Sequence, residues 1–259
     1  MLLCNSSLTA AESTTKTRLT LSPSLLHFDY TEFSEADAVL DRELGWLPGL
    51  AFKLSHTITS GWSFDIASSY YSGTVDYVGQ TQSGTPHTTD TGTNLFRIGG
   101  QINKEIYKKI HLFVGAKSHQ WNRDIRDSNN ISGIDETYKW LEYSIGLNSD
   151  IFIDQSNVFN IDVAYLLTRN GTIDVDLSRL NWGSTTLDLG DGTGARLNLN
   201  WKRISTNNIH YGVSIFAEGW NFGRSNTKLT QGGSPNKLVT EPRSETRNIG
   251  IKLTIEYGF

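Results

Sequence analysis

Four aromatic residues stand where flat rings could hold a ligand: Tyr71, Trp121, Trp140 and Trp220. Three polar residues occur at a similar depth in the alternating segments described below: Arg97, His119 and Glu142. Aromatic walls with a few convergent polar groups are typical of ligand pockets. These seven residues are the candidate binding site, interpreted as a cleft that opens to the outside. The alternative is that the rings only cap the interior.

Other motifs for chemistry are weak. The sequence has no Gly-rich phosphate loop with a Lys, and its one cysteine, Cys4, excludes a disulfide within the chain and a Cys/His metal set. Asp188 and Asp191 lie among the glycines of segment 190–194 and could hold a calcium ion weakly, but solvated loop aspartates are the favoured interpretation. We therefore predict no catalytic residue, no metal site and no cofactor.

The composition excludes two further classes. The net charge of −4 argues against a nucleic-acid partner, which would require a basic face. No apolar run approaches ~18 residues, the length of a membrane-spanning helix. The mean hydropathy is −0.35, which is compatible with a membrane barrel, since only alternate residues of such a barrel meet lipid.

Alternation of apolar and polar residues recurs along the chain and predicts strands with one apolar face. It is clear in segments 50–55, 62–70, 96–103, 140–147, 159–165, 196–202, 211–218 and 251–259. Two more strands, near 18–32 and 110–123, fit less cleanly, and the first loses its phase after Pro23, which we interpret as a bulge. The total is ten strands.

The connections between these strands alternate in length. Short polar ones fall at 59–61, 104–109, 154–157 and 205–208, and longer ones at 33–46, 79–93, 126–136, 178–194 and 228–241. This pattern predicts an all-β fold, a transmembrane antiparallel up-and-down β-barrel, because such barrels have short periplasmic turns and longer extracellular loops. Both termini are then periplasmic. The competing prediction is a soluble ten-stranded sandwich or lipocalin-like barrel with its apolar face inward.

The last strand carries a recognisable ending. Its apolar and aromatic residues alternate up to the end of the sequence: Ile251, Leu253, Ile255, Tyr257 and Phe259. This ending resembles the terminal signal of Gram-negative outer-membrane proteins. The resemblance implies a bacterial outer-membrane location, lipid around the barrel, and assembly machinery that recognises the C-terminal strand.

If the apolar residues face lipid, charged residues of both signs face inward: Lys53, Asp65, Arg97, Lys117, Glu142, Asp162, Arg196, Lys202, Glu218, Lys252 and Glu256. A ten-stranded barrel is only slightly wider than the eight-stranded kind that side chains can fill. We therefore expect a paired, side-chain-filled interior rather than an open pore.

The N-terminal segment, 1–16, is predicted to be a residual secretory signal or a disordered end, and 17–259 a single barrel domain. Ala10 and Ala11 form a plausible cleavage site. Cys4 could carry a lipid anchor, although Leu3 stands where lipoprotein signals have a small residue.

The ten-strand topology also resembles that of omptins, which are outer-membrane proteases with an Asp pair and an Asp–His pair at the rim. Asp76 matches the place of the first pair without a second Asp, and Asp176 stands where the His is expected after Asp174. The catalytic pattern is therefore not matched, although His87 or His119 could substitute through a different geometry. Barrels that modify lipid A use a Ser–His arrangement, and the nearest match here is His210 with Ser214. Both residues are predicted to lie at the periplasmic end, away from the leaflet that contains lipid A.

The leading hypothesis is a non-enzymatic surface barrel whose loops or outer cleft bind an extracellular ligand or surface. The first alternative is an omptin-like protease with a rearranged site, and the second is a narrow solute channel.

Overall fold

A computed structural model describes residues 16–81, 84–128, 131–154, 156–205 and 208–259. The predicted N-terminal segment, 1–16, lies outside these ranges apart from Lys16. Within them, no helix has the length and apolar character needed to cross a bilayer.

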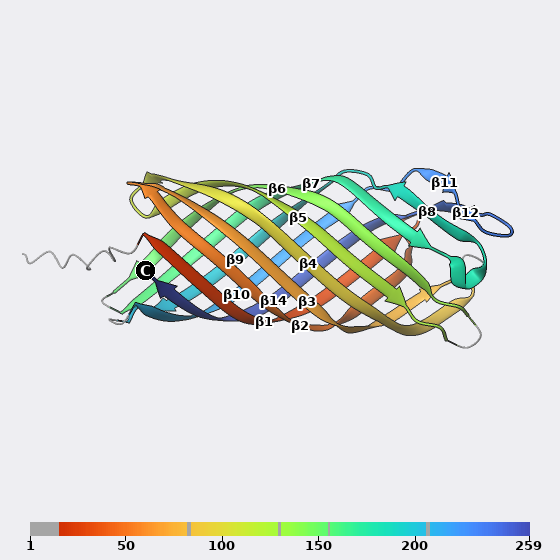
Figure 1. The fold of residues 1–259 in the computed structure, drawn as a ribbon, viewed down its shortest axis with the longest axis horizontal. Helices are drawn as coiled ribbons and strands as arrows, with labels where there is room; N and C mark the ends of the chain where they lie inside the picture. Colours follow the sequence, from red (N-terminus) through yellow and green to blue (C-terminus); the bar gives the residue numbers. More distant parts are fainter. Residues whose placement is uncertain (1–15, 82–83, 129–130, 155, 206–207) are drawn as a thin grey trace, which may run out of the picture.

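Ten long strands form a closed antiparallel barrel (Figure 1). They are β1 (Thr17–Phe33), β2 (Val39–Thr59), β3 (Trp62–Gln80), β4 (Pro86–Tyr107), β5 (Ile110–Ile125), β6 (Ile134–Ile153), β7 (Asn157–Asp176), β9 (Gly192–Arg203), β10 (Ile209–Phe222) and β14 (Arg243–Gly258). Each strand pairs with its neighbour in sequence, and β1 closes the ring by pairing with β14. The predicted all-β, ten-stranded fold is confirmed.

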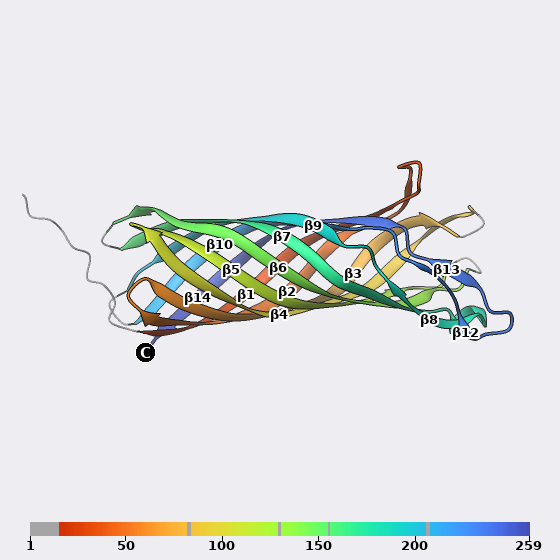
Figure 2. The ribbon, with the colours of Figure 1, turned by 90° about the horizontal axis from the view of Figure 1, so that it is seen from above.

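The remaining elements extend one end of the barrel (Figure 2). They are η1 (Ser178–Leu180), β8 (Gly183–Asp188), β11 (Thr227–Leu229), β12 (Gln231–Gly232) and β13 (Leu238–Thr240). β8 continues the pairing of β7 where β9 leaves it, and β12 adds to β8. We call this the loop end, and call the opposite end, with the short turns and the C-terminus, the terminal end.

The strands are longer than the sequence indicated. Segments assigned above to long connections, such as 39–46 and 86–93, are parts of β2 and β4. β2 has 21 residues and β4 has 22, whereas a tilted strand needs only ~9–11 to cross a bilayer. The barrel wall therefore projects well beyond any bilayer that surrounds it.

The exterior changes along the barrel. Around the terminal half it is a belt of exposed apolar side chains that includes Ile66, Ile145 and Ile251. Toward the loop end the outward positions carry ion pairs, such as Arg42–Asp29 at 2.6 Å and Lys139–Asp174 at 2.8 Å. An apolar belt suits lipid and a charged wall suits water.

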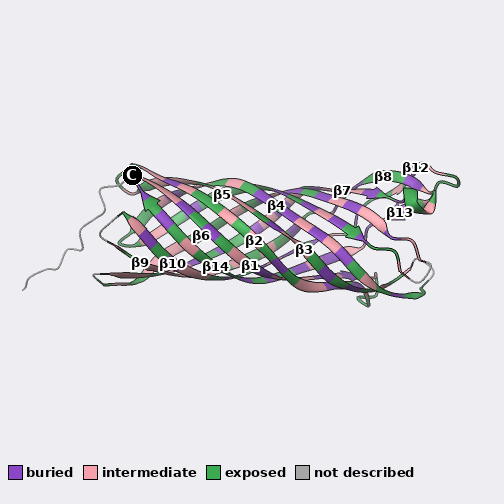
Figure 3. Cartoon of the chain, turned by 60° about the horizontal axis from the view of Figure 1, so that its bottom comes forward, coloured by how far each residue is buried: buried purple, intermediate pink, exposed green. Residues whose placement is uncertain are grey.

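The predicted bulge after Pro23 is wrong. Pairing of β1 with β2 runs without a shift from Thr17 to Glu32, and the only irregularity follows Glu32. Buried and exposed residues keep alternating along the strands (Figure 3). The apolar pattern changes phase because Leu26 and Phe28 point into the lumen, where they are almost fully buried. The interior itself becomes apolar at this depth.

Candidate functional site

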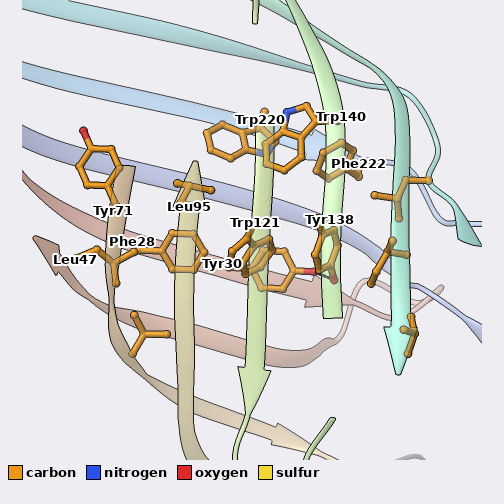
Figure 4. Close-up of a cluster of buried hydrophobic side chains, with 14 of the residues drawn as sticks. Phe28, Tyr30, Leu47, Tyr71, Leu95, Trp121, Tyr138, Trp140, Trp220 and Phe222 are labelled. Carbon is orange, nitrogen blue, oxygen red and sulfur yellow. Dashed lines mark hydrogen bonds between the residues drawn. The ribbon is translucent and has the colours of Figure 1, made fainter. Parts of the chain in front are cut away.

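The loop half of the lumen is filled by a cluster of rings that we call the aromatic plug (Figure 4). Its rings come from β1, β3, β5, β6 and β10: Phe28, Tyr30, Tyr71, Trp121, Tyr138, Trp140, Trp220 and Phe222. Trp121 stacks on Tyr138 with ring centres 4.6 Å apart, and Trp140 lies 5.8 Å from Trp220. Rings from opposite walls meet, so the plug spans the barrel.

The seven residues of the predicted cleft are brought together here. His119 stacks on Trp140 at 4.5 Å, and its Nε2 lies 3.2 Å from Glu142. The Arg97 guanidinium donates to Glu218 at 2.5 Å and lies 5.4 Å from the Trp220 ring centre.

Each of the seven residues of the predicted cleft is at most 5 % exposed. The described residues therefore leave no open cleft between these side chains. Ligand binding by this set stays a prediction, and it would require the plug to open.

The sequence analysis missed a buried ionic network centred on Arg123 of β5. Its guanidinium donates to four carboxylates: Glu32 at 3.0 Å, Asp41 at 3.0 Å, Glu43 at 2.7 Å and Glu136 at 2.7 Å. A fifth carboxylate, Glu241, accepts hydrogen bonds from Tyr138 at 2.6 Å and Tyr30 at 3.3 Å. We call these six ionisable residues the Arg123 network.

All six residues of the network are at most 7 % exposed. One oxygen of Asp41 and one of Glu43 accept no hydrogen bond from any described residue. Buried carboxylates of this kind are costly unless paired, so the single guanidinium holds together groups that otherwise repel. The network links β1, β2, β5 and β6 to the segment just before β14. It lies on the loop-end side of the aromatic plug.

The terminal half of the lumen is polar and hollow. A cavity of about 590 Å³, which we call the vestibule, extends from the terminal end to the plug. Lys117 and Arg196 pair with Glu142 at 3.0 and 3.5 Å, while Lys202 pairs with Glu256 at 3.1 Å. The ion-paired interior expected from the sequence is present, but only part of it is filled.

The residues tested for omptin-like chemistry are not assembled. Asp76 is exposed on the outside of β3. Asp174 is held on the outer wall by Lys139 and by Thr186 at 2.6 Å, and Asp176 accepts the Ser178 N–H at 2.9 Å. His87 is buried against Tyr77, with ring centres 5.6 Å apart. None of these side chains faces another in a geometry that would activate water.

The remaining candidates have other partners. His210 and Ser214 both line the vestibule, and His210 Nδ1 accepts the Ser205 N–H at 3.1 Å. Hydrogen bonds from Lys228 and Asn226 lower the pKa of the Asp188 carboxyl. Asp191 pairs with Arg169 at 3.4 Å. Among the described residues, no three or more His, Cys, Asp or Glu side chains are arranged so that they could hold a metal ion.

Comparison with known proteins adds information at the level of the fold. No protein-family model matches the chain, and no curated protein does. Among solved structures, the outer membrane protease OmpT from Escherichia coli superposes with a TM-score of 0.63 at 11 % identity, over 98 % of this chain and 99 % of that one.

Other matches are looser. The translocator domain of the autotransporter NalP from Neisseria meningitidis has a TM-score of 0.49 at 9 % identity, covering 96 % of this chain and 91 % of that one. The toluene transporter TodX from P. putida has a TM-score of 0.38 at 9 % identity, covering 95 % and 91 %. Such low identities speak for the fold alone, and the fold of this chain is that of an outer-membrane β-barrel with omptin-like ten-strand topology.

Proposed function

We propose that this chain is a closed, non-conducting surface barrel of the outer membrane, and that its loop end binds an extracellular ligand or surface. The main support is that the aromatic plug and the Arg123 network fill the lumen in the loop half, where the barrel wall extends beyond the apolar belt. A filled interior makes this projecting section a rigid support for the loops. Catalysis is not needed to explain any part of the arrangement.

In this proposal the terminal end lies in the periplasm and lipid surrounds the belt. The five residues of the C-terminal signal support that placement, since all of them point outward and are exposed: Ile251, Leu253, Ile255, Tyr257 and Phe259. An outward apolar edge is available to the assembly machinery. Phe259→Ala should then lower the amount of folded, heat-modifiable barrel in the outer membrane, and an unchanged amount would contradict the placement.

The binding surface that we propose is a groove on the outer wall near β8. Its lining is mainly carboxylate, hydroxyl and amide groups, and it includes Asp135, Thr137, Asp174, Asp176, Thr186 and Gln231. Such groups suit a ligand rich in hydroxyls, such as a glycan. Asp174 is already oriented by Lys139, so the groove is partly organised before a ligand arrives.

A glycan array probed with the purified barrel in nanodiscs tests this function. We expect binding by the wild type and loss of binding by the double variant Asp174→Asn/Thr186→Val. Asp76→Asn, an exposed carboxylate on β3 outside the groove, is the matched control and should bind normally. Binding that persists in the double variant would contradict the groove, and absence of glycan binding by the wild type would contradict the ligand class.

The two alternatives are tested with the same preparation. A closed lumen should give no steady open level in planar bilayers, whereas a solute channel should conduct. A peptide library should stay intact, whereas an omptin-like protease should cleave it. A steady conductance or reproducible cleavage would replace the proposed function.

A further inference from the structure

The inner end of the vestibule gathers cationic side chains from four strands. Arg97 comes from β4, Lys117 from β5, Arg196 from β9 and Lys252 from β14, and all four line the cavity. Lys252 interacts electrostatically with the other three and with Glu218. The carboxylates that face this group are Glu142, Glu218 and Asp162.

The ion pairs at the inner end of the vestibule leave an excess of positive charge. Arg97 takes Glu218, while Lys117 and Arg196 share Glu142. Arg196 also reaches Asp162 at 3.7 Å. Among the described residues no carboxylate lies within 4.0 Å of Lys252 Nζ, which instead lies 4.5 Å from the Phe216 ring centre. Four cations therefore face three carboxylates.

Unused donors accompany this excess charge. Arg97 Nε and Nη2 have no hydrogen-bond partner in the part of the chain that the structure describes, although the residue is only 5 % exposed. A guanidinium presents its donors in a planar fork that matches two oxygens of one anion. A buried cation without an acceptor is costly, so this end of the cavity favours an acceptor that carries negative charge.

The cavity also provides a route to the site. Side-chain exposure falls steadily along the vestibule, from 37 % for Arg18 and 32 % for Lys202 near the terminal end to 23 % for Lys117 and 6 % for Arg97. Seven cationic and five carboxylate side chains line the whole cavity. With Glu142 at the inner end included, cationic side chains are still in excess by one. An excess of one sign of charge in a narrow passage concentrates ions of the opposite sign.

We propose that the inner end of the vestibule binds a small oxyanion, a phosphate or a carboxylate, between Lys252, Arg97, Lys117 and Arg196. The oxyanion enters from the terminal end and supplies the negative charge that the three carboxylates leave unmatched. This site lies inside the lumen, whereas the groove near β8 is on the outer wall, and the two share no lining residue.

Isothermal titration of the folded barrel with inorganic phosphate, acetate or chloride at constant ionic strength tests the proposal. We expect phosphate and acetate to bind with one site per barrel and chloride to bind more weakly. Lys252→Met should weaken phosphate binding by at least about tenfold, the effect of losing one charged hydrogen bond. Lys237→Met removes the same charge at the loop end, where Lys237 Nζ lies 5.0 Å from the Trp182 ring centre, and should bind phosphate like the wild type.

A conservative variant keeps the test valid if Lys252→Met fails to fold. Lys252→Arg retains the charge, so it should fold and keep most of the phosphate affinity. Equal phosphate binding by the wild type and Lys252→Met, or no saturable binding of either oxyanion by the wild type, would overturn the proposal. Chloride binding as tight as that of phosphate would overturn the assignment to oxyanions.

Discussion

The two halves of the barrel are built inside out relative to each other. In the terminal half, apolar residues such as Ile145 and Ile251 are exposed on the outside, while the vestibule inside is polar. In the loop half, charged pairs such as Arg42–Asp29 cover the outside and aromatic rings fill the inside. One rule explains both halves: apolar side chains turn away from water, which lies inside the first half and outside the second.

The ionic groups differ in the same way. In the vestibule, Lys117 keeps 23 % exposure, and Glu142 has more than one cationic partner. In the loop half, Arg123 is 2 % exposed and is the one cation among the described residues that pairs with Glu32, Asp41, Glu43 and Glu136. If one cation of the vestibule is lost, Glu142 keeps another, whereas the loss of Arg123 leaves its four carboxylates with no cationic partner among the described residues. The halves should therefore respond differently to equivalent substitutions.

The largest effect is expected from emptying the aromatic plug. Replacing both Trp121 and Trp140 with Ala removes two nearly buried rings, each worth about 3–5 kcal/mol of stability in a packed core. Because the same rings block the lumen, a barrel that still folds should show a steady conductance in planar bilayers. Urea unfolding monitored by heat-modifiability gives the stability change.

The control for the plug is a ring in the terminal half. Trp62 is 42 % exposed on the apolar belt, so Trp62→Ala should cost far less and leave the lumen closed. If Trp62→Ala and the double variant lost equal stability, the packed interior would not distinguish the loop half from the terminal half.

A somewhat smaller loss should follow from Arg123→Met. This change leaves Glu32, Glu43 and their neighbours without a cation, and breaking a buried ion pair by removing one partner costs about 3–5 kcal/mol. Arg196→Met in the vestibule should cost less, because Lys117 still pairs with Glu142. The measurements are unfolding free energies and the rate of proteolysis at the loop end. Similar losses for both variants would remove the electrostatic part of the comparison.

The two exteriors can be compared with one type of substitution. Ile145 and Val78 are both outward and similarly exposed, at 49 % and 58 %, but Ile145 lies in the apolar belt and Val78 near the loop end. Ile145→Arg should destabilise the barrel by about 2–4 kcal/mol if it lies at the bilayer midplane. Val78→Arg should change stability by less than about 0.5 kcal/mol, as for an ordinary surface position. Equal effects in lipid bilayers would contradict the placement of the membrane.

The same inversion explains what the sequence could predict. Alternation located all ten strands because lipid requires one uniformly apolar face, which holds in the terminal half. In the loop half Leu26 and Phe28 turn inward, so the pattern changes phase and was interpreted as a bulge. Segment 39–46 of β2 looks like a loop for another reason: its buried inward residues are the carboxylates Asp41 and Glu43, and its outer face carries Arg42.

The candidate site could be predicted only in part. The sequence groups Trp121, Trp140 and His119 because their side chains point into the lumen at a similar depth. Strand register determines both the direction and the depth of a side chain. Their burial depends on rings that cross the lumen from non-neighbouring strands, such as Phe222 against Trp140. The Arg123 network joins residues as distant in the sequence as Glu32 and Glu241, so no spacing within a short segment could predict it.

The smallest effect is expected where both halves meet water directly, at the two ends. Asp154 lies in a turn of the terminal end, and its carboxylate accepts the Ser156 N–H at 2.7 Å and the Asn157 N–H at 2.6 Å. These backbone hydrogen bonds lower the pKa of Asp154, and a hydrogen bond from Lys228 lowers the pKa of Asp188 at the loop end.

A carboxyl group whose pKa is lower in the folded state stabilises the fold above its unfolded pKa of about 3.9 and loses that contribution as the pH falls through the folded value. Asp154→Asn and Asp188→Asn should therefore each remove a small contribution at pH 7 and make the stability flatter between about pH 4 and pH 2. High salt should weaken the effect at Asp188, which depends on a charged partner, more than at Asp154. Unfolding curves of both variants and the wild type at these pH values and two salt concentrations provide the check. A wild type and variants that lose stability in parallel as the pH falls would show that these end contacts contribute nothing.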